Sequence, residues 1–308
     1  MRLHRIKSAK QWFGLSLSLA ILSGCTTTPT QTVPVIQTRQ PIIAFALGGG
    51  GAKGFAHIGV IKVLESHGIR PKIITGTSAG SFVGSLYASG MTPYQLQEVA
   101  TVLRESDIRD ITLSSQGFII GQKLQDYVNF KVNQKPMEKF PIRFAAIATQ
   151  LDTGKRTVFN SGNAGQAVRA SCSIPNIFVP AMIGGKRYVD GGLVSPIPVI
   201  AARDMGADIV IAVDISARPK AGSGGVFGVL DQTFNIMGQQ GLDSELAQAS
   251  VVITPNVGGF GILDLNNRQQ SILEGERAAQ GQLAAIDRVI AAFKASPAAK
   301  LPAPKPRM

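Results

Sequence analysis

The sequence predicts one three-layer α/β/α sandwich with a mostly parallel central sheet, and three patterns lead to this prediction. Short apolar runs recur along the chain, helical patterns stand between them, and a glycine-rich turn joins the first run to its helix. The expected strands cover residues 42–47, 72–75, 142–149, 156–160, 187–190, 208–215 and 251–255. The last two runs are almost continuously apolar, which is typical of parallel strands buried on both faces. Strands that alternate with helices predict helices on both faces of one sheet.

The expected helices carry recognisable start and stop signals. The first ends near His67, before Gly68, and the second begins after Ser78. Thr92 can cap a third helix, with Pro93 at its first position and Gln95 completing a capping box. The last helix carries one apolar stripe, formed by Ile272, Ala279, Leu283, Ile286 and Ile290.

The chain is expected to have four parts. Residues 1–24 read as a signal peptide, because a basic segment precedes an apolar stretch too short to cross a bilayer. Leu22-Ser23-Gly24-Cys25 looks like a bacterial lipobox, which would make Cys25 the acylated first residue of the mature chain. An ordinary signal with a nearby cysteine is the alternative. Residues 25–40 are expected to form a flexible tether, 41–295 the folded domain and 296–308 a disordered tail.

The lipobox carries an expectation about location. Thr26 follows Cys25, whereas lipoproteins kept in the inner membrane usually have aspartate there. We therefore expect a lipid-anchored protein of the bacterial cell envelope, on the outer membrane and facing the periplasm.

Charge and cysteine content restrict the classes of partner. The formal charge is +12, and it becomes +8 when the four basic residues of the signal are removed, which favours anionic lipid head groups. The basic residues are scattered, so nucleic acid is not an expected partner. Two cysteines and three histidines show no zinc-ligand spacing, and we expect no metal and no organic cofactor. The oligomeric state stays open.

The segment Gly76-Thr77-Ser78-Ala79-Gly80 has the pattern of a nucleophile elbow. A serine that exposes its oxygen at a strand end must sit on a sharp, strained turn, and glycines on either side let the strand and helix approach. The next backbone N–H then points into the site from a helix N-terminus. A serine in an ordinary strand-to-helix corner is the alternative, but the preceding strand and following helix favour an elbow.

A second glycine-rich segment, Ala46 to His57, also follows a strand and precedes a helix. Gly49, Gly51 and Gly54 match the dinucleotide-binding spacing, but the acidic residue expected near the end of the second strand is missing. Successive glycine N–H groups can instead bind the oxyanion of an acyl-transfer reaction. A purely structural turn is the alternative.

A general base for Ser78 cannot be a histidine in the usual order. No histidine follows Ser78: His4 lies in the signal, His67 ends a helix and His57 is expected to pack inside one. Acids at strand ends are therefore the candidates. Asp190 enters Gly191-Gly192, and Asp214 lies near another strand end. Asp152 reads as part of a polar turn between strands. Position favours Asp190 only modestly over Asp214.

Taken together, these segments resemble the patatin-like phospholipase family. The resemblance rests on Gly49-Gly50-Gly51-Ala52-Lys53-Gly54, the Gly76–Gly80 elbow, a block at residues 169–180 and Asp190-Gly191-Gly192, in that order. It implies a catalytic dyad in which Ser78 is the nucleophile and Asp190 the base. It also implies an oxyanion hole from the N–H groups of Gly49, Gly50 and Gly51, with Lys53 beside it. Asp214 would then be structural, and Cys172 a packed residue.

The function implied by this resemblance is hydrolysis of acyl esters in phospholipids or other lipids through an acyl-enzyme intermediate, as in phospholipases A, lysophospholipases and related carboxylic ester hydrolases. Two alternatives stay open, a nucleotide-binding α/β protein and a non-catalytic envelope lipoprotein. Residues 221–241 are glycine-rich and apolar, and either pack on the sheet or form a flap that contacts lipid. Head group, chain length, positional preference and the choice between hydrolysis and acyl transfer stay open.

Overall fold

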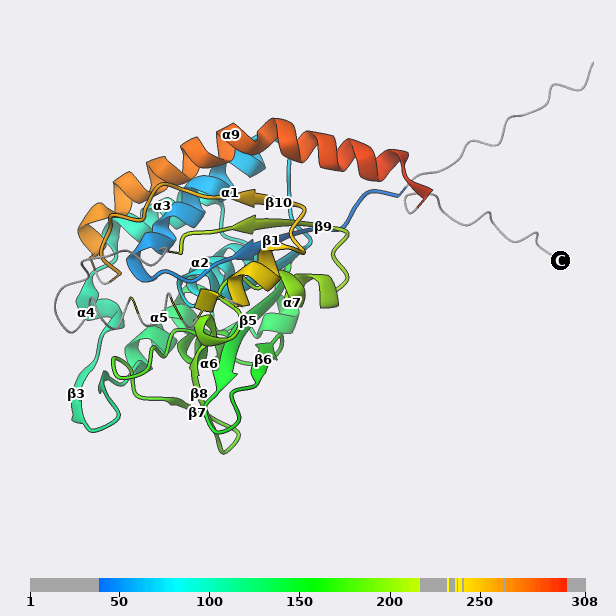
Figure 1. Cartoon of the computed structure of the whole chain (residues 1–308). Coiled ribbons are helices and arrows are strands. Elements are labelled where there is room, and N and C mark those ends of the chain that lie inside the picture. Colours follow the sequence, from blue (N-terminus) through cyan, green and yellow to red (C-terminus); the bar gives the residue numbers. More distant parts are fainter. Residues whose placement is uncertain are drawn as a thin grey trace, which may run out of the picture. The chain divides into compact units, whose positions relative to one another are not determined.

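The structure is a computed structural model that describes residues 39–216, 232, 236, 238–239, 241–262 and 264–297 (Figure 1). Its strands are β1 (Ile43–Leu47), β2 (Ile73–Thr77), β3 (Ile111–Ser114), β4 (Gly117–Ile119), β5 (Arg143–Gln150), β6 (Arg156–Phe159), β7 (Ala181–Ile183), β8 (Lys186–Asp190), β9 (Ile209–Val213) and β10 (Val251–Ile253). Its α-helices are α1 (Ala56–Ser66), α2 (Ala79–Ala88), α3 (Pro93–Val102), α4 (Glu105–Ile108), α5 (Gln122–Lys131), α6 (Ala164–Ser171), α7 (Val199–Asp204) and α9 (Arg268–Ala295). Short 3-10 turns are η1 (Gly51–Phe55), η2 (Met137–Lys139), η3 (Gly191–Leu193) and η4 (Leu265–Asn267).

One eight-stranded sheet organises the domain. Its order is β10-β9-β1-β2-β5-β8-β7, and β6 also pairs with β5. The five strands from β10 to β5 are parallel to one another. β6, β7 and β8 join in antiparallel pairs. The predicted mostly parallel sheet is confirmed, and the sequence had not indicated the direction of these last strands.

Helices cover both faces of this sheet, and the alternation of side chains along β1 shows how. Ile43, Phe45 and Leu47 belong to one hydrophobic core with residues of α1, α2, α3, α5, α6 and α9. Ala44 and Ala46 belong to a second core, which includes residues of α7 and Leu242 of the helical segment 241–246. Successive strand side chains point to opposite faces. The predicted three-layer arrangement follows from this alternation.

The last helix packs along the first. Figure 1 shows α9 running over α1, and glycines allow their backbones to approach closely. A Cβ atom placed on Gly59 would lie 1.9 Å from the carbonyl oxygen of Ile272, and one on Gly275 would lie 2.0 Å from that of Ala56. The predicted stripe of α9 faces this contact, because Ile272, Ala279 and Ile286 are all buried.

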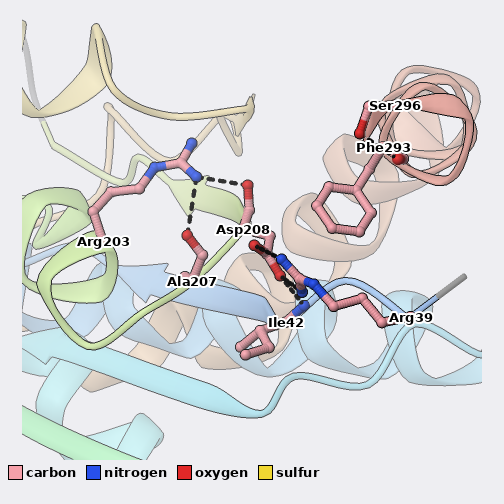
Figure 2. Close-up of polar contacts among 7 residues, drawn as sticks. All are labelled: Arg39, Ile42, Arg203, Ala207, Asp208, Phe293 and Ser296. Atoms are coloured by element: carbon pink, nitrogen blue, oxygen red, sulfur yellow. Dashed lines mark hydrogen bonds and ion pairs between the residues drawn. The ribbon is translucent and has the colours of Figure 1, made fainter. Parts of the chain in front are cut away.

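A polar cluster fixes the chain just before β1 (Figure 2). The Arg39 guanidinium donates two hydrogen bonds to the Asp208 carboxylate, of 2.6 and 2.8 Å, and the Ile42 N–H donates a third of 2.8 Å. The same guanidinium lies 4.9 Å from the centre of the Phe293 ring in α9. Arg203 donates to the carbonyl oxygens of Ala207 and Asp208. The entry to β1 is therefore tied to the segment before β9 and to α9.

The local signals of the sequence are largely confirmed. Thr92 accepts a hydrogen bond from the Gln95 N–H, and the Gln95 side chain accepts one from the Thr92 N–H, as a capping box requires. The β3–β4 hairpin was not predicted. Its strands are only four and three residues long, and two of its apolar residues, Ile111 and Leu113, are exposed instead of buried.

Candidate active site

Ser78 occupies a strained turn between β2 and α2. Its backbone has φ 51° and ψ −122°, a conformation that non-glycine residues rarely adopt. A Cβ atom on Gly80 would lie 2.1 Å from the carbonyl oxygen of Leu47, and one on Gly76 would lie 2.5 Å from that of Gly80. Only glycine allows the strand, the turn and the helix to pass this closely. The arrangement is that of a nucleophile elbow.

Asp190 reaches Ser78 because two strands meet end to end along one edge of β5. β2 ends at Thr77, which is opposite Ile147, and β8 ends at Asp190, which is opposite Ala148. β6 pairs with these same β5 positions and must therefore occupy the other edge. β2 and β8 run in opposite directions, so their last residues converge. The residues that follow Thr77 and end β8 are thereby brought into one pocket.

The carboxyl group of Asp190 is held for an interaction with Ser78. Its Oδ1 accepts a hydrogen bond of 2.7 Å from the Gly192 N–H, while its buried Oδ2 has no hydrogen-bond partner among the described residues. The Ser78 side chain is nevertheless close enough to lower the pKa of Asp190. The Ser78 hydroxyl and the Asp190 carboxyl group are therefore neighbours without a formed hydrogen bond. Such contacts are often poorly aligned before substrate binds.

Burial controls the protonation of Asp190. It raises the pKa of the carboxyl group from 3.8 to about 6, while the nearby Ser78 hydroxyl and the hydrogen bond from the Gly192 N–H lower the pKa. Removal from water disfavours the charged form of an acid. An acid with a pKa near 6 is a better proton acceptor at neutral pH than an ordinary carboxylate.

The glycine loop supports only part of the predicted oxyanion hole. The Gly49 N–H donates a 3.0 Å hydrogen bond to the Pro196 carbonyl, so it is not available to an oxyanion, and this corrects the prediction for Gly49. Gly50 and Gly51 stand at the N-terminus of η1, where N–H groups have no partner within the helix. Both line the pocket with Ser78. They remain as candidate donors, together with the Ala79 N–H that begins α2.

The remaining motif residues shape the same pocket. The Lys53 side chain is buried and lines the pocket with Ser78 and Asp190. A Cβ atom on Gly54 would lie 2.5 Å from that of Ala79, and one on Gly191 would lie 2.2 Å from the Ile147 carbonyl oxygen. Gly54 therefore allows η1 to contact the start of α2, and Gly191 allows the turn after Asp190 to pass β5.

Ser171 supports the elbow from below, a role that the sequence did not show. The Ser78 N–H donates a 2.9 Å hydrogen bond to the Ser171 hydroxyl, which itself donates to the Ile147 carbonyl at 2.5 Å. Ser171 is fully buried at the end of α6. The only sign of this role in the sequence was that Ser171 lies inside the block 169–180. Its hydrogen-bond partners, Ser78 and Ile147, are distant in the chain.

A second buried support was also missed. The Glu245 carboxylate accepts hydrogen bonds from the Ser195 hydroxyl and from the Ile200 N–H at the start of α7. The Thr77 hydroxyl donates to the Ser195 carbonyl at 2.7 Å. Burial is the main cause that raises the pKa of Glu245. Glu245 thus fixes the segment that lies beneath the end of β2.

His57 is not a candidate base. It is fully buried, burial lowers its pKa to about 4, and its Nε2 lies 2.8 Å from the Gly48 carbonyl oxygen. Because a neutral ring must donate to a carbonyl, the proton is assigned to Nε2. His57 therefore fixes the start of the glycine loop. His67 is exposed, and its Nε2 lies 3.2 Å from the Asp287 carboxylate of α9.

The other candidate groups have different partners. The Asp214 carboxylate accepts hydrogen bonds from the N–H and the hydroxyl of Ser216. Asp152 forms an ion pair with Arg187 in an exposed turn. Burial, followed by the charge of Asp190, raises the pKa of Cys172 to about 12, so its thiol stays protonated. Asp190 is the acid that shares a pocket with Ser78.

Two pockets meet at Ser78. One pocket, called the polar pocket because it contains the side chains of Lys53, Asp190 and Ser216, is also lined by Gly50, Gly51, Gly192 and apolar residues such as Leu242. The apolar pocket is lined by side chains that include Phe55, Phe82, Val83, Leu103, Leu124 and Phe178. Ile174 and Ile262 line both pockets. A substrate with one polar and one apolar part can therefore place the bond between them at Ser78.

Two of the predicted features lie wholly or mostly outside the residues that the structure describes. Cys25 and most of residues 221–241, the candidate flap, lie outside the described residues. Within the described ranges, no group of histidine, cysteine, aspartate or glutamate side chains is arranged to hold a metal ion. No helix in the same ranges is long and apolar enough to cross a bilayer.

Comparison with known proteins places this site in context. Residues 45–203, more than half of the 308-residue chain, match the family described as Patatin-like phospholipase. An uncharacterized NTE family protein of Mycobacterium bovis is 35% identical over 181 residues, which are 58% of this chain and 50% of that protein. Lysophospholipase NTE1 of Pyricularia oryzae is 32% identical over 183 residues, which are 57% of this chain and 12% of that protein. The chain thus spans half or less of these relatives.

One solved structure shares the fold. The crystal structure of VipD from Legionella pneumophila aligns with a TM-score of 0.54 and 13% sequence identity, covering 83% of this chain and 68% of that one.

Proposed function

The chain belongs to the patatin-like phospholipase family, and on that premise we propose that it is a serine lipid acyl hydrolase with Ser78 and Asp190 as its catalytic dyad. The observation that carries this proposal is the convergence of β2 and β8. It sets a strained, buried serine beside a carboxyl group whose Oδ2 is unpartnered within the described chain. Ser81, Ser85 and Ser171 are also buried, but their hydroxyls donate to backbone carbonyls.

The proposed reaction has two steps, acylation of Ser78 and hydrolysis of the acyl-enzyme. The Ser78 oxygen attacks the ester carbonyl carbon while its proton passes to Asp190. N–H groups of Gly50, Gly51 and Ala79 stabilise the negative oxygen of the tetrahedral intermediate, and each well-placed donor contributes about 3 kcal/mol. The intermediate collapses to acyl-Ser78, and the alcohol leaves with the proton from Asp190. Water then attacks the acyl carbonyl carbon and gives a proton to Asp190, and Asp190 returns that proton to the Ser78 oxygen as the acyl–oxygen bond breaks and the fatty acid leaves.

The two pockets suggest how a lipid would bind. The acyl chain would occupy the apolar pocket, because its lining offers mostly hydrocarbon surface. The alcohol part, with any head group, would face the polar pocket beside Lys53 and Gly192. The scissile ester would then lie at Ser78, which both pockets share.

A substrate panel tests the proposed reaction. The purified protein is offered phospholipids, lysophospholipids and water-soluble short-chain esters, and free fatty acid and alcohol are measured. We expect release of fatty acid from at least one lipid class, and labelling of the protein by a fluorophosphonate probe. If no substrate of the panel were cleaved and the probe did not label the protein, the hydrolase proposal would be rejected. A melting temperature that rises when ATP or NAD is added would show nucleotide binding and favour the nucleotide-binding alternative.

We also propose that the chain is exported and anchored by acylation of Cys25. The support is the lipobox-like segment Leu22–Cys25 after a basic and then apolar stretch. In bacteria that express the full chain, labelled palmitate should be incorporated, and the Cys25→Ser variant should lose the label and accumulate in the unprocessed form. Equal incorporation in both proteins would contradict the anchor. Outer-membrane placement is a further expectation, which membrane fractionation tests.

A further inference from the structure

The β3–β4 hairpin presents apolar side chains to solvent. Leu113 is 100% exposed, Ile111 84%, Phe118 58% and Ile120 39%. Thr112 and Ser114, the polar residues of β3, are partly buried. A strand on a protein surface normally turns its apolar side chains inward and its polar ones outward. The alternation of β3 is thus the reverse of the usual one. We call Ile111, Leu113, Phe118 and Ile120 the hairpin face.

The hairpin carries neither charge nor proline, two of the features that keep an exposed edge soluble. Residues 111–120, Ile-Thr-Leu-Ser-Ser-Gln-Gly-Phe-Ile-Ile, contain no charged side chain and no proline. Natural sheets usually protect such edges with lysine, proline or a covering element. An uncharged apolar projection of this kind is a mark of an interaction surface.

The hairpin is attached to the wall of the apolar pocket. The N–H groups of Phe118 and Ile119 both donate to the Ile177 carbonyl, and a Cβ atom on Gly117 would lie 2.5 Å from the backbone of Phe178. Phe178 lines the apolar pocket, and so do Ile108 and Arg109, which lie just before β3. Figure 1 shows the hairpin projecting away from the main sheet. Its face therefore stands beside a pocket that contains Ser78.

We propose that the hairpin face inserts into a phospholipid surface and holds the apolar pocket against it, an inference that rests on the proposed function. A stable protein–protein interface uses about 20–30 residues on each side, far more than these four side chains. Apolar side chains on a peripheral protein can instead reach about 5–10 Å into the boundary between head groups and acyl chains, and the strength of binding grows with the apolar area that is buried. A lipid substrate could then pass from that surface into the pocket.

Fluorescence at one position tests the insertion directly. The full chain contains a single tryptophan, Trp12. A protein with Trp12→Phe, Cys25→Ser and Ser78→Ala, which has neither the acylation site nor the nucleophile, receives Leu113→Trp. The matched control receives Tyr94→Trp instead, because Tyr94 is 66% exposed on α3. Phosphatidylcholine vesicles with and without brominated acyl chains are then added.

We expect the tryptophan at position 113 to shift its emission to the blue and to be quenched by brominated lipid, and the control tryptophan to show neither change. This readout is local, so binding of vesicles by the N-terminal segment does not imitate it. Absence of the shift at position 113, or an equal shift in the control, would overturn the proposal. A dimer that dissociates when the hairpin face is altered would also overturn it, in favour of a second copy as partner.

Kinetics separates this inference from the proposed function. In the Cys25→Ser chain with Ser78 intact, the double change Leu113→Ser and Phe118→Ser should lower kcat/KM on phospholipid vesicles by about tenfold or more, since transfer of two such side chains from water to lipid favours binding by at least this ratio. It should leave kcat/KM on a water-soluble ester unchanged, as should Tyr94→Ser. Equal activity on vesicles would reject the hairpin proposal alone. If the Cys25→Ser chain with an unaltered hairpin face also hydrolysed no soluble ester, the proposed function itself would be rejected.

Discussion

Replacement of Ser78 by alanine is expected to lower ester hydrolysis by at least about 10⁴-fold and to abolish labelling by a fluorophosphonate probe. The change removes the atom that would carry the acyl group, and loss of a serine nucleophile leaves only the catalysis provided by binding and the oxyanion hole. Initial rates on a soluble ester and the mass of the labelled peptide measure the two effects.

The serine at the other end of α2 serves as a matched control. Ser89 follows α2, and its hydroxyl donates to the Leu86 carbonyl, so Ser89→Ala should keep both activity and labelling. Ser78→Ala should also retain the fold, because the side chain is small and the elbow is fixed by Gly76, Gly80 and Ser171. Equal labelling of the wild type and Ser78→Ala would show that the nucleophile is another residue.

Replacement of Asp190 by asparagine is expected to lower kcat by about 10³–10⁴-fold, the range that loss of a general base produces. The amide has nearly the shape of the carboxylate and can still accept from the Gly192 N–H. Its other end would donate toward Ser78 and could not take the serine proton. Asp214→Asn is the control, because Asp214 is the rival acid at a strand end. Its carboxylate accepts from Ser216, so Asp214→Asn should retain turnover.

The Asp190→Asn variant should be at least as stable as the wild type at neutral pH. Burial raises the pKa of Asp190 to about 6 in the folded protein, above its ordinary value of 3.8. The folded state therefore binds more protons than the unfolded state between about pH 4 and 6, and stability falls as pH rises through that window. The charged carboxylate then costs about 3 kcal/mol at pH 7. Asp190→Asn should match or exceed the wild-type melting temperature at pH 7, and a large loss would indicate a structural role.

The pH dependence of the wild type follows from the same group. The base must be ionised, so kcat/KM on a soluble ester should rise about tenfold per pH unit below pH 6 and level off above it. The profile is measured from about pH 4.5 to 8.5, with circular dichroism at each pH to confirm that the protein stays folded. A flat profile across pH 6 would contradict Asp190 as the base.

Much of the fold could be predicted because its causes are local in the chain. The apolar runs became β1, β2, β5, β8, β9 and β10, and the stripe of α9 faces α1. The elbow could be predicted because the glycines around Ser78 are explained by steric contacts within a few residues and with the end of β1. The hairpin at residues 111–119 could not be predicted, because its strands are only four and three residues long, too short for an alternating pattern to be distinguished.

The sequence by itself determined the strained serine turn, the glycine-rich loop and the order of blocks that indicates the family. Only the tertiary structure decided which acid meets the serine. Asp190 ends β8 and Asp214 directly follows β9, and local position favours Asp190 only modestly. β8 runs antiparallel along the same edge of β5 as β2, so Asp190 arrives opposite Ala148, beside the end of β2. It also decided that Gly49 donates to Pro196 and is lost as an oxyanion donor. Strand direction and hydrogen-bond partners depend on contacts between distant segments, which local propensity does not encode.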